Sequence, residues 1–132
     1  MDAAQKDLVR HRAGHICEYC QLPQAGAPFF TFHIEHIMAR QHGGDDSLTN
    51  LALACPDCNA YKGPNLTSID PETEQVVPLF NPREQSWTEH FFLRGPVIFG
   101  QTPTGRATVK LLQMNEEIRI EMRRRLQEIG AM

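Results

Sequence analysis

Two cysteine pairs and the short segment between them carry the groups of this sequence that are best able to do chemistry. The pairs are Cys-x-x-Cys motifs, and the segment supplies imidazoles and a carboxylate; the residues are Cys17, Cys20, Cys55, Cys58, His33, Glu35 and His36. The two thiolates of such a motif flank a tight turn and converge on one ion, so two motifs provide the four ligands of a tetrahedral metal. A four-sulfur site needs neither carboxylate nor imidazole. The cysteines therefore indicate a scaffold, and the enclosed segment indicates a reactive site.

The cysteines are more typical of a metal site than of disulfide bonds. Charged residues interrupt the segment from Met1 to Arg12, so it does not resemble a signal peptide, and no stretch reaches the length of a membrane span. We therefore expect a cytoplasmic protein, in a reducing compartment where paired cysteines bind metal. Zinc is the default occupant, although sulfur ligands alone leave a single iron or an iron–sulfur cluster open.

Length and composition fit one small domain with a modest core. The chain has 132 residues, of which 41% are hydrophobic, and a formal net charge of -3. This charge argues against a protein that coats nucleic acid by bulk electrostatics, although local clusters of arginine can still contact phosphate. Such clusters occur at Arg10 and Arg12 and in the segment from Arg119 to Arg125.

Local signals predict the elements that position the cysteines and the segment between them. A capped helix is expected over Asp2–Ala13, a strand over Phe29–Ile37, turns over His42–Ser47, an apolar run at Leu51–Ala54 and a short helix over Pro56–Lys62. The reactive segment therefore lies on or at the end of a strand. If that strand is regular through its end, alternation places His33 and Glu35 on one face and His36 on the other.

The second half of the sequence has local signals for further short helices and strands. Strand-like composition occurs at Val76–Phe80, Pro96–Phe99 and Ala107–Leu112, and the aromatic segment Trp87–Leu93 has no clear type. From Asn115 onward the apolar residues recur at helical spacing, at Ile118, Met122, Leu126 and Ile129. A terminal amphipathic helix is the prediction there.

Oxygen and imidazole groups between the cysteine pairs and just after the second pair suggest a second, catalytic metal. A carboxylate from Glu35 and an amide oxygen from Asn50 or Asn59 can hold magnesium or manganese and leave positions for water and phosphate. The imidazole of His36 is of the side-chain type that can take a proton from water at neutral pH. These are the parts for metal-assisted hydrolysis of a phosphodiester.

The order of the motifs resembles the HNH endonucleases, specifically their four-cysteine, zinc-containing branch with a ββα-metal finger. The order is Cys-x-x-Cys, Glu-His, Gly-Gly, Asn-Leu and Cys-x-x-Cys-Asn-x-x-Lys-Gly, between Arg12 and Pro64. The resemblance implies a small α+β single domain, residues 1–132. In it a finger over residues 12–64 is stapled by zinc, and a C-terminal extension, residues 65–132, packs on that finger with flanking helices and short strands.

The resemblance also implies a role for each matching residue. His36 is the general base, Glu35 beside it is a metal ligand, and Asn50 steadies the loop and the backbone of the catalytic histidine. Asn59 stands at the third motif position and completes the metal site, which makes this an H-N-N variant. Lys62 is a candidate contact to the substrate phosphate. His33 is a rival metal ligand or a partner of one, or is structural.

The expected function is therefore an endonuclease that hydrolyses DNA with a divalent metal, on a scaffold held by structural zinc. The resemblance implies products with 5′-phosphate and 3′-hydroxyl ends. The expected partner is DNA, with no membrane, and the chain acts as a monomer or a homodimer. The alternative is a zinc-ribbon module that binds nucleic acid or protein without catalysis. A rubredoxin-like electron carrier explains the cysteines and leaves Glu35, His36, Asn50 and Asn59 without a role.

Overall fold

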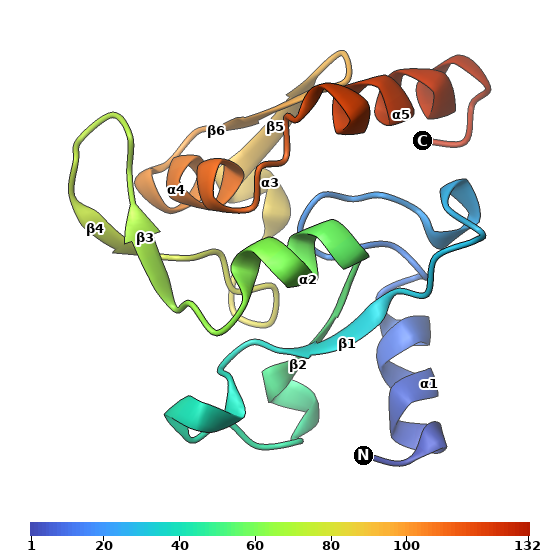
Figure 1. Ribbon diagram of the computed structural model, residues 1–132, viewed down its shortest axis with the longest axis vertical. Helices are drawn as coiled ribbons and strands as arrows, with labels where there is room; N and C mark the ends of the chain where they lie inside the picture. The colour runs from blue at the N-terminus through green and yellow to red at the C-terminus, as the bar shows by residue number, and fades with distance from the viewer. The chain divides into compact units, whose positions relative to one another are not determined.

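The computed structural model describes residues 1–132 and confirms the α+β class. It contains five α-helices and three two-stranded antiparallel sheets. The contacts divide the chain into two units, Met1–Asn65 and Leu66–Met132 (Figure 1). None of the helices is long and apolar enough to cross a membrane. The packing of residues 65–132 on the finger, as one domain, stays a prediction.

Helix α1, Ala3–Arg12, opens the first unit and begins and ends where its capping residues predict. The Asp2 carboxylate caps it by accepting a hydrogen bond from the Gln5 amide at 2.8 Å. Gly14, at a φ of 64°, supplies the left-handed conformation that ends the turn after the helix. The Arg12 guanidinium then donates to the carbonyls of Leu48 and Leu51, at 2.8 and 2.7 Å. These bonds hold α1 against the backbone that enters the strand Leu51–Ala54.

A ββα finger forms the centre of the first unit. Strand β1, His33–His36, pairs antiparallel with β2, Leu51–Ala54, and helix α2, Pro56–Lys62, follows directly (Figure 1). Every residue of β2 is buried. Helix α2 has the predicted limits because proline favours the first helical position and Gly63 follows the last. The finger that the resemblance implied is therefore present.

Strand β1 is shorter than the predicted strand Phe29–Ile37. The Gln24 side chain donates to the carbonyls of Ala27 and Phe30, at 3.1 and 2.6 Å, and accepts from the Phe32 amide at 3.2 Å. These bonds give the backbone before β1 a partner other than a neighbouring strand. The aromatic composition of this segment therefore marks a braced loop, in which Phe29 is 95% exposed.

The second unit consists of two hairpins and three helices. Its elements are β3 (Thr67–Ile69), β4 (Val76–Pro78), α3 (Trp87–His90), β5 (Phe91–Arg94), β6 (Val97–Gly100), α4 (Pro103–Leu111) and α5 (Glu117–Glu128). Strand β3 pairs with β4, and β5 pairs with β6. Helix α4 contacts both hairpins. An ion pair fixes one of these contacts, because Arg106 on α4 bonds both oxygens of the buried Asp70 at 2.9 Å.

The predicted strand Ala107–Leu112 was wrong, because Ala107 to Leu111 belong to helix α4. Thr102 caps this helix by accepting from the Gly105 amide at 3.0 Å, and Pro103 occupies its first turn. Helix-start signals therefore outweighed the β-propensity of the threonine and valine that follow.

The buried face of α5 also differs from the predicted one. Ile118 is 73% exposed and Ile129 is 76% exposed, whereas Arg119 and Arg123 are buried together with Leu126. Arg119 donates to the Leu112 carbonyl at 2.6 Å, and Arg123 donates to the carbonyls of Pro96 and Met114. Carbonyls beyond the end of α4 need donors, and a guanidinium supplies several at once. This requirement turns the arginines inward.

Candidate active site and metal centre

The four cysteines of the first unit converge in one buried cluster. Their sulfur atoms all lie within 4.8 Å of one another. The Cys20 and Cys55 sulfurs are 3.7 Å apart. A disulfide needs about 2.05 Å, whereas ligands at about 2.3 Å on a tetrahedral zinc are roughly 3.8 Å apart. Burial raises the pKa of the Cys17 thiol, so a bound cation is needed to hold it as a thiolate. The donor set therefore fits a structural zinc.

The cluster joins the turn after α1 to the end of β2 and the start of α2. The first cysteine pair follows α1, while the second pair ends β2 and begins α2. Between the first two cysteines, Glu18 exchanges backbone and side-chain hydrogen bonds with Leu53 on β2, at 2.9 and 2.8 Å. The amide of Cys58 donates to the Cys55 sulfur at 3.4 Å, which caps α2. A metal at the cluster thus fixes α2 against the hairpin β1–β2.

Glu35 is a buried carboxylate with two protein partners. It is 5% exposed, its Oε1 accepts a hydrogen bond from the Tyr19 hydroxyl, and its Oε2 lies 3.3 Å from the Lys62 ammonium. Burial raises the pKa of Glu35, and the positive charge of Lys62 acts in the opposite direction. The ammonium of Lys62 also donates to the Ile37 carbonyl at 3.0 Å.

The structure gives Lys62 contacts that differ from the expected contact to a substrate phosphate. Its side chain is 3% exposed, since the buried carboxylate of Glu35 and the carbonyls at the end of β1 draw the ammonium inward. The three-residue spacing predicted that Lys62 lies next to Asn59 on α2, but it did not predict which way the Lys62 side chain points. Arg40 is the exposed cation beside the site, with 66% of its side chain accessible.

An open cavity of about 420 Å³ brings most of the predicted site residues to one surface. Its lining includes His33, Glu35, His36, Arg40 and Asn59. Strand β1 ends at His36, and the chain bends at the next two residues. Alternation along β1 buries Glu35 between Tyr19 and Lys62 and leaves His36 half-buried, yet both residues line the cavity.

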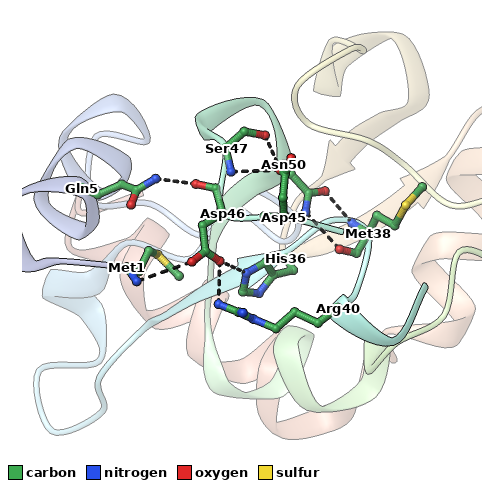
Figure 2. Close-up of polar contacts among 9 residues, drawn as sticks. All are labelled: Met1, Gln5, His36, Met38, Arg40, Asp45, Asp46, Ser47 and Asn50. Carbon is green, nitrogen blue, oxygen red and sulfur yellow. Dashed lines mark hydrogen bonds and ion pairs between the residues drawn. The ribbon is translucent and has the colours of Figure 1, made fainter. Parts of the chain in front are cut away.

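A carboxylate that the sequence analysis did not identify holds the ring of His36. The Oδ1 atom of Asp46 lies 2.7 Å from Nε2 of His36, and Arg40 donates to the same oxygen at 2.7 Å (Figure 2). The hydrogen bond to His36 holds the pKa of Asp46 below its usual value, with a further contribution from Arg40. The only sequence signal was a pair of acidic residues four and five positions before Asn50, in a segment otherwise typical of turns.

Asn50 bridges the chain after β1 to the loop before β2. Its Oδ1 accepts from the Met38 amide at 2.8 Å, and its Nδ2 donates to the carbonyls of Met38 and Asp45, at 3.0 and 2.8 Å (Figure 2). The backbone approaches so closely there that a Cβ on Gly44 would lie 1.7 Å from the Met38 carbonyl oxygen. Only glycine fits this position.

The oxygen donors of Glu35 and Asn59 suit a hard divalent cation. Both residues line the cavity, and Asn59 is half-buried on α2 next to Cys58. Carboxylate and amide oxygens are ligands that magnesium and manganese prefer, and a site with two of them retains coordinated water. His33 is exposed at the rim of the same cavity. By donor type, Glu35 and Asn59 are the cavity residues that would hold a second, hard metal.

Loss of one cysteine should unfold the finger far more readily than loss of a cavity residue. We expect Cys55→Ser to release the zinc and to lower the free energy of unfolding by more than about 3 kcal/mol, because structural zinc binding contributes directly to folding. Asn59→Ala, one turn along α2, should cost less than about 1 kcal/mol. Elemental analysis and urea unfolding measure both quantities, and Cys55→Ser with one zinc per chain and wild-type stability would contradict the assignment.

The pairing of Lys62 with Glu35 predicts a strong coupling between them. Lys62→Met alone leaves a buried carboxylate uncompensated, so the free energy of unfolding should fall by about 3–5 kcal/mol. Adding Glu35→Gln removes the stranded charge, and the double variant should be more stable than the sum of the single losses predicts. Urea unfolding of the four proteins completes the cycle, and additive losses would rule out a paired, buried charge.

Comparison with known proteins agrees with this geometry. Residues 17–65 match the family model described as HNH endonuclease, a segment that contains both cysteine pairs, β1, β2 and α2. No curated protein and no solved structure matches the chain. Residues 17–65, which hold the four-cysteine cluster and the cavity, thus carry a match to the HNH endonuclease family.

Proposed function

We propose that the protein is a metal-dependent endonuclease that hydrolyses DNA phosphodiester bonds, with His36 as the general base. The observation that carries this proposal is the cavity at the end of β1, where an imidazole lies beside a carboxylate and an amide. A base, oxygen ligands for a metal and an exposed cation are what phosphodiester hydrolysis requires of a protein. The family match of residues 17–65 supports the same reaction class.

Each residue has a defined task in this proposal. His36 takes a proton from the attacking water, and Glu35 and Asn59 hold magnesium or manganese. The bound metal would supply positive charge to the phosphate and to the departing 3′-oxygen. Arg40, exposed at the cavity, contacts a phosphate oxygen in place of the buried Lys62. Lys62 instead offsets part of the cost of burying the Glu35 carboxylate.

DNA is the proposed substrate, as the resemblance to the HNH endonucleases implies, and contacts to its phosphates carry no sequence information by themselves. One site cuts one strand, so a monomer nicks duplex DNA, while a homodimer is needed to cut both strands at once. The net charge of -3 makes contact depend on local cations such as Arg40. A cytoplasmic setting, which keeps the four thiols reduced, agrees with the proposal.

One observation favours a second function, a zinc-stapled module that binds nucleic acid or protein without cutting it. The carboxylate of Glu35 already has Tyr19 and Lys62 as partners. The ion pair to Lys62 is 3.3 Å long, however, which exceeds the roughly 2.7–2.9 Å of a close charge-assisted bond. A metal could therefore replace Lys62 as the partner of Oε2.

Plasmid cleavage separates the two functions. Purified protein should nick supercoiled plasmid when magnesium or manganese is added, and His36→Ala should reduce the rate by at least about 100-fold, the usual contribution of a general base. His42→Ala is the matched control, because it removes an exposed histidine from the neighbouring loop and should leave the rate unchanged.

Equal cleavage by the wild type and His36→Ala would contradict the proposal and point to a contaminating nuclease. A wild type that cuts nothing but shifts DNA in a salt-sensitive manner would favour the binding module.

A further inference from the structure

The loop between β1 and β2 places the carboxylate of Asp46 next to Nε2 of His36. Nε2 is the ring nitrogen farther from the backbone. The Oδ1 of Asp46 is 2.7 Å from Nε2 of His36, with 18% of the histidine side chain and 31% of the aspartate side chain exposed. This distance is that of a strong, charge-assisted hydrogen bond. Ten residues separate the pair, so the loop and not local sequence brings them together.

The position of Asp46 is fixed from both sides of the loop. Asn50 donates to the carbonyl of Asp45, the residue just before it, at 2.8 Å. Gln5 on α1 donates through its side chain to the carbonyl of Asp46 itself (Figure 2). The loop backbone is therefore held on each side of the peptide that carries Asp46, and its carboxylate has a defined direction.

The contact determines which nitrogen of His36 is free. A neutral imidazole has one donor nitrogen and one acceptor nitrogen, and an ionised carboxylate can only accept. Arg40 donates to the same Oδ1 at 2.7 Å, which favours the ionised form of Asp46. The proton of a neutral His36 is therefore placed on Nε2, and the lone pair is left on Nδ1.

We propose that Asp46 is the positioning residue of His36, holding its imidazole in the Nε2–H form so that Nδ1 accepts the proton of the attacking water. This inference rests on the proposed nuclease function. The O–H bond of water breaks as an N–H bond forms at Nδ1, and the oxygen bonds to phosphorus. The bond from phosphorus to the 3′-oxygen then breaks, and that oxygen takes a proton from solvent. The imidazolium produced is paired with the Asp46 carboxylate.

Asp45 offers a matched control for Asp46. It is the adjacent acidic residue of the same exposed loop, but its carboxylate accepts from the amide and hydroxyl of Ser47, at 3.0 and 2.6 Å, and not from His36. Asp45→Asn removes the same charge from the loop and keeps an acceptor for Ser47. A role of Asp46 that only concerned loop charge would be shared by Asp45.

The test combines the tautomer of His36 with its kinetics. In zinc-loaded, ¹⁵N-labelled protein, the ring signals of His36 are identified by their loss in His36→Ala. The wild type should show the Nε2–H form, Asp46→Ala should show a mixture of both tautomers, and Asp45→Asn should match the wild type. In metal-dependent cleavage, Asp46→Ala should lower kcat about 10- to 100-fold, part of the contribution of a general base, with KM within about twofold. Asp46→Asn, which still accepts from Nε2–H, should recover part of the loss.

The outcomes separate this inference from the proposed function. A wild type without metal-dependent cleavage overturns both. A wild type that cleaves DNA while Asp46→Ala keeps its kcat, or keeps the wild-type ring signals of His36, overturns the inference and leaves the function standing. If Asp46→Ala does not fold, Asp46→Leu, which keeps a side chain of similar length and removes the acceptor, takes its place, and a full wild-type kcat in that variant overturns the inference.

Discussion

Four cysteine sulfurs that converge within 4.8 Å of one another hold the N-terminal unit in its arrangement. That unit spans Met1–Asn65, a size at which the hydrophobic core alone supplies little stability. The cluster compensates by joining the turn after α1, the end of β2 and the start of α2. The cavity residues lie on β1, on the loop between β1 and β2, and on or just after α2. The cysteines of the cluster are thus not among the residues that line the cavity, but the metal that they fit determines where those residues lie.

Buried cations complete this arrangement at the places where regular elements end. Lys62 donates to the Ile37 carbonyl just beyond β1, while Asn50 bonds both backbone groups of Met38, the next residue. The chain after His36 is therefore held from both sides. The second unit uses the same device, because Arg119 donates to the Leu112 carbonyl just beyond α4. In each case a long cationic side chain gives a buried carbonyl the donor that it needs.

The sequence predicted the parts of the molecule that depend on local rules. Helix α2 has the expected limits because Pro56 and Gly63 act through their own backbone preferences. Local rules failed where a distant side chain decides, as with Gln24, whose three hydrogen bonds convert half of a predicted strand into a loop. The cavity residues Glu35, His36 and Asn59 followed from motif order, whereas Asp46 and Arg40 could not. Their role depends on the path of the loop, which spacing alone does not determine. The sequence did not predict the inward direction of the Lys62 side chain for the same reason.

Hydrolysis of DNA by an activated water can be followed through the fate of the water oxygen. A defined duplex is cut in water enriched in ¹⁸O, and the ends of the products are analysed by mass spectrometry. One ¹⁸O atom is expected on each 5′-phosphate, with an unlabelled 3′-hydroxyl at every cut. Products with 3′-phosphate ends, or 5′-phosphates without the label, would contradict attack by water from the side opposite the 3′-oxygen.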